Sequence, residues 1–593
     1  NLGWEDNAIS ETGYEVERKV GVAGKYVIIA TVPADVTSYR DSSVSRGGQY
    51  YYRVRAVGPS THSNSSNEAR ALALVQRHTS SWSASAETRL NGGWLHDRFT
   101  KNYNCLFLNV NPETFPHVYE GVRPSWYAEP EFAGKYVDSC VTLYRYFRDP
   151  AILQRAATVV AGMIRHQRTD GYLGTYGSTD EFDTFSVWNQ TFTIRGLLSY
   201  YGVTHDAKAL EAATRCADFL IESFLRPGGP DLLQAINDGT QHSCILGDLV
   251  RLYNVTGNPA YLDFCQYIVQ RWNGSANLQL IANAGDWAKA GSRKAAEMLI
   301  CYQGLMELFD ATSDSSYREA TKSYWRSIAS TQISVTGSGS LHERWNVVGN
   351  DPTYLTATVG LPGDRPHEIA EPCENCVAVT WMKLSAMLLL ETGEGRYADA
   401  FERALYNHLL GSQSLDGCDF SYYQPQDGRK VHANPPGKYA CCRYRGLNML
   451  AHLPEWIVLQ SGEGPIVNLY TDATSKVKAG NVDVQIVQRT DYPRHGRVRL
   501  EVNPSSPAAF RLRLRQPGWS RQPAVRVNGE TVSARAENGF IALERTWKRG
   551  DSVELTIYMP VSVTRGAVQG EPRAAVSYGP LVLAIDSRYG AAI

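Results

Sequence analysis

The feature that most constrains the fold is an internal repeat in the middle of the chain, where one apolar helical pattern ends and the next begins. Each copy has a helix end, a tight turn, and then an Asp, Asn or Glu that can cap the following helix. The five copies are LYRYFRDPAIL (143–153), YYGVTHDAKAL (200–210), LYNVTGNPAYL (252–262), LFDATSDSSY (308–317) and LLETGEGRY (389–397). Their capping positions are 57, 52, 56 and 80 residues apart, and each interval can hold an antiparallel helix pair.

Six such pairs, counting the less regular ends, predict an (α/α)6 toroid over about residues 80–460. An open helical solenoid is the alternative arrangement of stacked pairs. The 80-residue interval carries an insertion that includes GSGSLHERW (337–345) and EIAEPCENC (368–376). Because a long irregular connection inside a compact helical domain is usually functional, we expect the active site there.

Both ends of the chain alternate apolar and polar residues, which is the pattern of half-buried strands. Residues 1–75 do so in YEVERK and YYYRVRAV, and residues 461–593 do so in VRLEV, FRLRLRQPGW and VELTIYM. A small β-sandwich is therefore predicted for 1–75 and a larger one for 461–593. A multidomain architecture also fits the length of 593 residues, since single cores stop growing near ~250–300 residues.

The charge balance excludes one class of partner. Lys and Arg number 59 against 60 for Asp and Glu, a net charge of −1, so there is no basic field for nucleic acid. No apolar run is long enough to predict a membrane span, and no signal peptide is visible. The chain begins at NLGWEDN, inside a predicted strand, so a signal removed upstream is compatible with it. The oligomeric state is not set by these patterns.

Four of the eleven cysteines stand apart from the others. Cys373 and Cys376, and later Cys441 and Cys442, come just before apolar helical runs, and a helix N-terminus stabilises a thiolate. A thioredoxin-like role for CENC is not favoured, because no βαβ unit is visible nearby. The remaining interpretations are a metal site of four sulfurs, a metal site of three sulfurs plus Glu371, and packed thiols or a disulfide. Six cysteines are expected to be small buried apolar residues, namely Cys105, Cys140, Cys216, Cys244, Cys265 and Cys301.

Several motifs together resemble the glycoside hydrolase family 127 group, typified by β-L-arabinofuranosidases. They are Glu371-Pro372-Cys373, the Cys441-Cys442 pair, QRTDGYLGTY (167–176) and LRQPGW…VRVNGE…ERTWKRGD. The resemblance runs from roughly residue 90 to 585 and implies an (α/α)6 catalytic domain followed by a β-sandwich. It also implies a zinc ion held by Glu371, Cys373, Cys441 and Cys442, with Cys441 as the nucleophile and Cys376 as a bystander.

The same resemblance implies a general acid/base just after a VTG-type segment. Glu343, in VTGSGSLHERW, is the candidate and lies 28 residues before Glu371. Glu368 is a weaker rival near the implied metal site. His242, in TQHSCILGDLV, falls where the family has a helix histidine that contacts the sugar. Two further family histidines are absent, with Phe192 or Thr193 near one position and Ser292 or Arg293 near the other.

The function expected from this resemblance is a retaining exo-glycoside hydrolase, a β-L-arabinofuranosidase acting on oligo- or polysaccharides of plants or microbes. Alternatives are a related hydrolase for another unusual sugar, such as an acidic branched pentose or a 3,6-anhydro-galactose, a polysaccharide lyase, and a non-catalytic zinc-stabilised carbohydrate-binding protein. An arginine such as Arg293 at the pocket would favour an acidic sugar. The segment with Trp4 and the strands at 14–18 and 50–56 resembles a fibronectin type III domain without its first strand, which implies a secreted or periplasmic protein.

Overall fold

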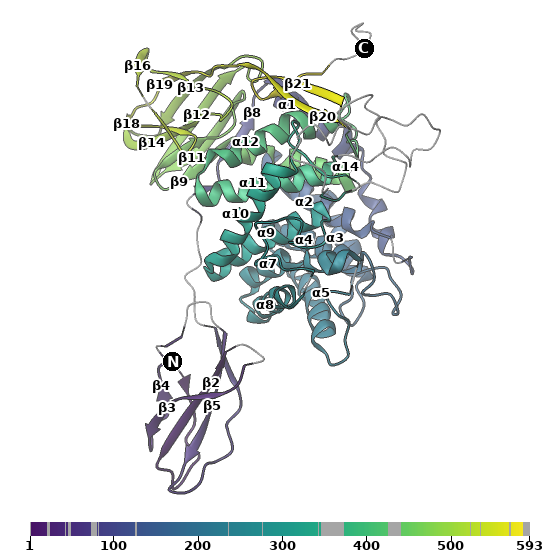
Figure 1. Ribbon diagram of the computed structural model, residues 1–593, viewed down its shortest axis with the longest axis vertical. Coiled ribbons are helices and arrows are strands. Elements are labelled where there is room, and N and C mark those ends of the chain that lie inside the picture. The colour runs from purple at the N-terminus through teal and green to yellow at the C-terminus, as the bar shows by residue number, and fades with distance from the viewer. Residues whose placement is uncertain are drawn as a thin grey trace.

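The computed structural model describes most of the chain. The residues that it does not describe are 1, 21–23, 42, 45–48, 73–79, 81, 125–126, 235, 276, 342, 346–372, 425–440, 522, 534, 569–570 and 585–593. Figure 1 shows a helical domain in the middle, β-sheets at one end of it, and a small N-terminal β-domain that stands apart at the other end. This layout confirms the predicted multidomain fold.

Six helices form a closed inner ring in the helical domain. In the order of their contacts they are α2 (Pro130–Phe147), α4 (Ser186–Thr204), α7 (Leu246–Thr256), α9 (Ala295–Thr312), α11 (Asn375–Thr392) and α14 (Cys441–Ala451), and α14 packs back on α2. Their residues are buried on nearly all sides, as α9 shows most clearly, because neighbours flank them and a second layer covers them. Ring closure rejects the open solenoid and confirms the (α/α)6 toroid.

The outer layer consists of helices that each follow or pack on an inner helix. They are α3 (Pro150–His166), α5 (Ala207–Leu225), α8 (Pro259–Gly274), α10 (Ser315–Thr331) and α12 (Gly395–Arg403), with α1 (Gly93–Lys101) and η1 (Asn102–Phe107) beside α14. The shorter helices are η2 (Pro112–Thr114), η3 (Pro116–Tyr119), η4 (Ile236–Gly239), α6 (Thr240–Ser243), η6 (Ala404–Leu409), α13 (Leu410–Ser412) and η7 (Leu453–Trp456).

The predicted capping residues begin the outer helices. Asp149, Asp206, Asn258 and Asp314 each accept a hydrogen bond from the backbone N–H two residues ahead. Glu394 also precedes its helix, α12, but its side chain makes no capping bond. The repeat seen in the sequence is therefore the repeated turn from an inner helix to an outer one.

Two sheets pack into a β-sandwich after the toroid. One has the order β17-β18-β14-β10-β9-β7 and the other β16-β15-β19-β13-β12-β11-β8. Strands β7 (Trp82–Ser83) and β8 (Glu87–Leu90) come from before the toroid, so the two ends of the helical domain meet in this sandwich. The other strands are β9 (Val458–Ser461), β10 (Gly464–Val467), β11 (Ala473–Ala479), β12 (Val482–Thr490), β13 (Arg497–Pro504), β14 (Ala508–Arg515), β15 (Ala524–Val527), β16 (Glu530–Val532), β17 (Ala536–Glu537), β18 (Phe540–Trp547) and β19 (Asp551–Thr556).

Two smaller groups of strands complete the structure. A three-stranded sheet follows the sandwich, with β20 (Val561–Val568), β21 (Glu571–Tyr578) and β22 (Leu581–Val582). The N-terminal domain has a sheet of order β3-β2-β5-β6 and a β1-β4 pair. Its strands are β1 (Leu2–Gly3), β2 (Gly13–Val20), β3 (Val27–Pro33), β4 (Ser38–Tyr39), β5 (Gln49–Val57) and β6 (Ala69–Leu72). Val16, Tyr50 and Tyr52 form its core, against which Trp4 packs.

One cysteine prediction is wrong. Cys105, expected to be a buried free thiol, is disulfide-bonded to Cys418, which lies 313 residues later. The bond ties η1 to the connection that follows α13. The other five single cysteines are free and buried, as predicted.

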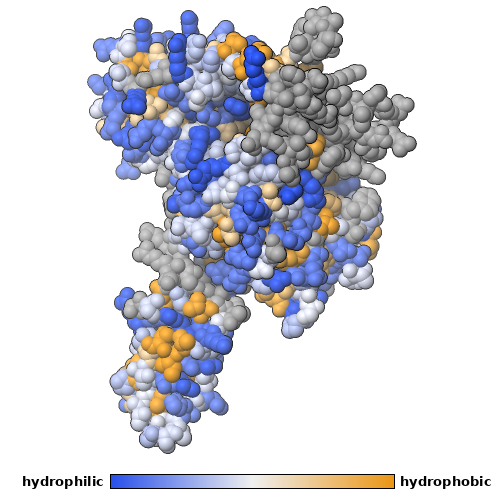
Figure 2. All heavy atoms as spheres, in the orientation of Figure 1, coloured by the Kyte–Doolittle hydropathy of each residue, from blue (hydrophilic) through white to orange (hydrophobic). Residues whose placement is uncertain are grey.

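Hydrophilic residues predominate on the visible face of the helical domain and the sandwich (Figure 2). Within the described residues, no helix is long and apolar enough to cross a membrane.

Candidate active site

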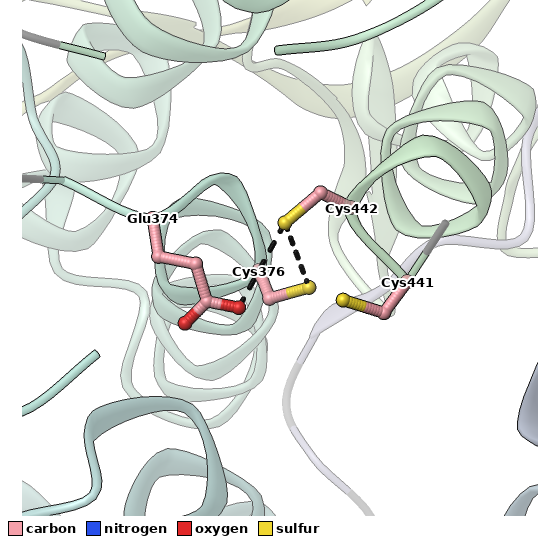
Figure 3. A group of neighbouring side chains, drawn as sticks. All are labelled: Glu374, Cys376, Cys441 and Cys442. Carbon is pink, nitrogen blue, oxygen red and sulfur yellow. Dashed lines mark hydrogen bonds between the residues drawn. The ribbon is translucent and has the colours of Figure 1, made fainter. Parts of the chain in front are cut away.

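The candidate active site lies where the first turns of neighbouring inner helices meet. Cys376 is in the first turn of α11, with Glu374 immediately before that helix, while Cys441 and Cys442 begin α14. Figure 3 shows the four side chains converging from these two helices. One potential ligand atom from each lies within 4.8 Å of all the others.

Short polar contacts hold the two helix starts together. The Sγ atoms of Cys376 and Cys442 are 3.3 Å apart, and Cys442 Sγ is 3.8 Å from Glu374 Oε1. The Asn375 side-chain amide donates to the Cys442 carbonyl at 3.2 Å, and the Asn375 backbone N–H donates to the Tyr422 carbonyl at 2.8 Å. The segment around Tyr422 is therefore fixed against the group.

The predicted ligand set needs a correction. The structure places Glu374 and Cys376 beside Cys441 and Cys442, and Cys373 is not a member of this group. Cys373 precedes the helix in the left-handed region, with φ of 53°, and its N–H donates to the Ser340 carbonyl. Cys376, predicted to be a bystander, thus lies within the group. Glu371 and the rival acid Glu368 lie outside the described residues.

The three thiols of the group differ in the direction of their pKa shifts. Hydrogen bonds from Cys376 and then Cys442 hold the pKa of Cys441 well below its usual value, although burial acts in the opposite direction. Burial instead raises the pKa values of Cys376 and Cys442. Cys441 is also the one thiol of the group that is partly exposed. The arrangement therefore presents an accessible thiolate, which is the nucleophilic form of cysteine.

Glu343 lies next to this thiolate group and is held by three donors. Its Oε1 accepts hydrogen bonds from Tyr422 at 2.7 Å and Tyr423 at 2.8 Å, and Lys294 pairs with its Oε2. Burial raises the pKa of Glu343, but the charge of Lys294 and these hydrogen bonds outweigh it, so the pKa lies below the usual value. The Tyr422 hydroxyl also helps to lower the pKa of Cys441, so it connects the two candidate catalytic groups.

The pKa of Glu374 is shifted in the opposite direction to that of Glu343. Its side chain is buried, and burial, followed by the nearby charge of Glu343, raises its pKa well above the usual value. A carboxyl group in such a place either stays protonated or binds a cation.

The other side of Cys441 is built by α2 and α4. Lys135 pairs with Glu131 at 3.1 Å, and Glu131 also accepts a hydrogen bond from the Trp188 indole. Lys135 Nζ lies 4.6 Å from the centroid of the Phe192 ring, and the Arg445 guanidinium of α14 lies 5.2 Å from the same centroid. Lys135 contributes to the lowered pKa of Cys441, and the Arg445 charge also interacts with Cys441, so this cationic pair lies beside Cys441.

The predicted sugar contacts lie at several places. His242 is buried and packs against Phe224 with ring centroids 5.7 Å apart, and burial lowers its pKa to about 4, so the ring is neutral. Thr193 bonds to Tyr119, and Ser292 bonds to Thr240. None of these contacts joins the thiol group. The role of His242 in binding sugar stays a prediction.

The donor set fits a tetrahedral Zn²⁺. Structural and catalytic zinc sites use thiolate, imidazole and carboxylate ligands, with Zn–S bonds of about 2.3 Å, so bound sulfurs lie about 3.8 Å apart. The observed 3.3 Å between two sulfurs is close to that separation. A bound cation would offset the burial and the Glu343 charge that raise the pKa of Glu374.

Sequence reasoning missed several residues of the site. Glu374-Asn375-Cys376 repeats the Glu-x-Cys spacing of Glu371-Pro372-Cys373, so the spacing alone could not choose between them. The position of Cys376 in a predicted first turn was a usable signal. Lys294, Tyr423 and Arg445 carried no motif that set them apart.

The chain matches two family models. Residues 85–455 match "Beta-L-arabinofuranosidase, GH127 catalytic domain" and residues 465–559 match "Beta-L-arabinofuranosidase, GH127 middle domain". A relative called non-reducing end beta-L-arabinofuranosidase, from Bifidobacterium longum subsp. longum, is 25% identical over 508 residues, which cover 76% of this chain and 74% of the relative.

Solved structures share the fold. A GH127 beta-L-arabinofuranosidase from Geobacillus stearothermophilus T6 superimposes with a TM-score of 0.67 and 23% identity, covering 84% of this chain and 86% of its own. A GH127 beta-arabinofuranosidase gives a TM-score of 0.69 with 22% identity, covering 85% and 84%.

Proposed function

The chain belongs to the GH127 beta-L-arabinofuranosidase family of glycoside hydrolases, and from this premise we propose that it cleaves its substrate with retention, using Cys441 as nucleophile and Glu343 as acid/base. The observation that carries the proposal is the pairing of one accessible thiolate with a carboxyl group through Tyr422. Retaining glycosidases need these two roles, a nucleophile and a proton donor that later acts as base.

In the first half of the reaction, Cys441 Sγ attacks the anomeric carbon while the bond from that carbon to the leaving oxygen breaks. Glu343 gives its proton to the leaving oxygen. In the second half, Glu343 takes a proton from a water molecule, whose oxygen attacks the anomeric carbon and releases Sγ as thiolate. Two inversions give net retention.

Tyr422, Tyr423 and Lys294 are proposed to position Glu343 and set its proton affinity. Their contacts favour the carboxylate, which suits the second half of the reaction, in which the group acts as a base. The first half needs the protonated form, so the working pH range is expected to extend to the acidic side.

We further propose that Glu374, Cys376, Cys441 and Cys442 hold a zinc ion. When bound, the ion would keep its cysteine ligands deprotonated and neutralise part of their charge. The donor types and their proximity support this assignment. Equilibrium dialysis followed by elemental analysis is expected to give one zinc per chain, lost in Cys376→Ser and retained in Cys216→Ser, since Cys216 is a buried thiol outside the group.

The proposed substrate is a β-L-arabinofuranoside at the non-reducing end of a plant or microbial glycan. The names of the relatives support it. The Cys105–Cys418 disulfide supports an oxidising location, so we propose that the protein is secreted or periplasmic.

The test is hydrolysis of 4-nitrophenyl β-L-arabinofuranoside by the zinc-loaded chain, with product stereochemistry followed by NMR. Release of the β-anomer first, with turnover lost in Cys441→Ser and Glu343→Ala, is the expected result. An α-anomer as first product would reject the retaining mechanism. Metal content with sugar binding but no turnover on a wide panel of glycosides would instead favour the non-catalytic carbohydrate-binding alternative.

A further inference from the structure

We propose that Arg344 is a positioning residue, which holds the carboxyl group of its neighbour Glu343 where it can protonate the leaving oxygen. This inference rests on the proposed function, because that function makes Glu343 the acid/base. It goes beyond that function by assigning the placement of the carboxyl group to a side chain that ties the Glu343 segment to two other connections of the toroid.

The first observation is the backbone conformation of Glu343. Its φ is 63°, in the left-handed region that is unfavourable for a residue with a Cβ atom. Arg293, in the segment that pairs with it, also has a φ of 63°. Such residues persist only where the surrounding structure fixes them, and they concentrate at functional sites. The contacts that fix the Glu343 backbone therefore also set the direction of its side chain.

The second observation is that backbone hydrogen bonds fix the Glu343 segment to the start of α9. The Ala295 N–H donates to the Glu343 carbonyl at 2.9 Å, and the Trp345 N–H donates to the Arg293 carbonyl at 2.8 Å. Trp345 is buried, and its indole donates to the Tyr324 hydroxyl of α10 at 2.8 Å. The backbone is thus held at Glu343 and at Trp345, and Arg344 is the residue between these two points.

The third observation is where the Arg344 side chain binds. Its Nη1 donates to the Ser292 carbonyl at 3.0 Å, and its Nη2 donates to the side-chain oxygen of Asn237. The Thr240 hydroxyl lies 2.6 Å from the Asn237 carbonyl and 2.7 Å from the Ser292 hydroxyl, so the two acceptors are held to each other. Because a guanidinium is planar, two such bonds fix its orientation as well as its position.

The position of the Glu343 carboxyl group depends on both ends of its side chain. Tyr422 and Tyr423 hold the carboxyl end, and the strained backbone sets the other end. A proton donor must lie about 2.6–3.2 Å from the atom that it protonates, and a misplacement of about 1 Å can cost about 10²-fold in rate. Loss of the Arg344 contacts is expected to let the backbone relax and to move the carboxyl group away from the leaving oxygen.

The test is the dependence of kcat/KM on the leaving group, measured with the full-length, zinc-loaded chain. The substrates are β-L-arabinofuranosides whose leaving groups range from 4-nitrophenol to a simple alcohol. A poor leaving group needs a proton from the acid, whereas 4-nitrophenol needs little help. Arg344→Met is expected to lower kcat/KM for the alkyl glycoside by about 10- to 100-fold and to change it far less for the 4-nitrophenyl glycoside. A general weakening of the fold would lower both values equally.

Two further variants keep the result interpretable. Arg271→Met is the matched control, because Arg271 pairs with Asp231 at 2.6 Å, in the same connection as Asn237. The ratio of the two kcat/KM values should stay that of the wild type in this control. Asn237→Gly removes one acceptor of Arg344, and glycine suits the φ of 55° at that position. A smaller change of the ratio in the same direction is expected. If Arg344→Met does not fold, Asn237→Gly decides, and a wild-type ratio in it rejects the proposal.

Glu343→Ala, measured on the same substrates, separates this inference from the proposed function. The proposed function predicts that Glu343→Ala depends most steeply on the leaving group. If it does, but Arg344→Met lowers kcat/KM equally for all substrates or not at all, the inference is rejected and the acid/base stands. If Glu343→Ala has the leaving-group dependence of the wild type, or if the wild type cleaves no substrate of the series, the proposed function is rejected together with the inference that rests on it.

Discussion

The molecule has two clusters of buried charged residues. One lies at the candidate active site of the toroid, and the other lies where the toroid meets the β-sandwich. The two clusters contain similar residue types but differ in how completely these residues pair with one another. At the junction, Arg515 of β14 donates to the Asn468 carbonyl, to Asp399 and to Glu402. Glu402 also accepts hydrogen bonds from Tyr492 and Trp519. Every charged group there has a protein partner.

In the cluster at the candidate active site, fewer of the charged groups have a partner within the described part of the chain. Cys441 is a partly exposed cysteine whose pKa is held well below its usual value, and Nε and Nη2 of Arg445 have no hydrogen-bond acceptor among the described residues. The same chemical groups thus stabilise the structure where they pair with one another, and remain available for a ligand where they do not. The two buried arginines, Arg515 and Arg445, express this difference most directly.

The largest expected effect is on activity. Cys441→Ser is expected to lower kcat/KM by roughly 10⁴-fold or more, as removal of a nucleophile does in other covalent enzymes, and to lower thermal stability to a smaller extent, because Cys441 is also a proposed zinc ligand. Steady-state kinetics and a melting curve measure both. Retention of a tenth of the activity would show that another group is the nucleophile.

The next effect is on stability at the junction. Arg515→Met leaves Glu402 buried without its cation, so the free energy of unfolding should fall by about 3–5 kcal/mol. Denaturant titration measures this. Arg511→Met, on the same strand but with exposed partners Glu463 and Glu544, is the matched control and should cost much less. Equal losses of unfolding free energy in the two variants would contradict the claim that the buried ion pair contributes more to stability than the exposed one.

The third expected effect is on stability, and it concerns the connection that contains Tyr422 and Tyr423. Cys418 lies four residues before Tyr422. Replacing Cys105 and Cys418 by serine should lower stability by about 2–4 kcal/mol. Reduction by dithiothreitol should lower the melting temperature of the wild type but not that of the double variant. An identical response of the two proteins to reductant would show that the bond does not form.

The smallest expected effect is on the pH dependence of activity, through the pKa of Glu343. The first half-reaction needs protonated Glu343, so kcat/KM falls as pH rises through the pKa of that group. Burial raises this pKa, and Lys294 is the largest influence that lowers it. Lys294→Met should therefore raise the pKa and move the alkaline limb of the pH profile to higher pH. Lys289→Met, which removes an exposed pair with Asp286, should leave the limb in place.

The architecture could be predicted from the sequence because it depends on local, repeated signals. A short turn recurs at five inner-to-outer helix junctions, and at four of them the predicted residue caps the outer helix, as Asp149 and Asp206 do. The cysteines at two helix starts were also a signal for the group of side chains that the structure brings together. What these signals could not provide was a choice between two consecutive Glu-x-Cys triplets, since both have the same spacing.

Other features depend on contacts between distant segments. The partner of Cys105 lies 313 residues away, and the closeness of Lys294, Glu343 and Tyr423 arises from three separate connections. The lack of a hydrogen-bond acceptor at Nε and Nη2 of Arg445, within the described residues, likewise depends on where the fold places that side chain. Such properties appear once the ring of helices has closed.

The most direct test of the central claim is peptide mass spectrometry of Glu343→Gln after rapid quenching with 4-nitrophenyl β-L-arabinofuranoside. With the second half-reaction slowed, the account predicts one pentosyl group bound to Cys441, absent in the Glu343→Gln/Cys441→Ser double variant. A pentosyl adduct on a different residue, or release of nitrophenol with no adduct at any point of the time course, would contradict it.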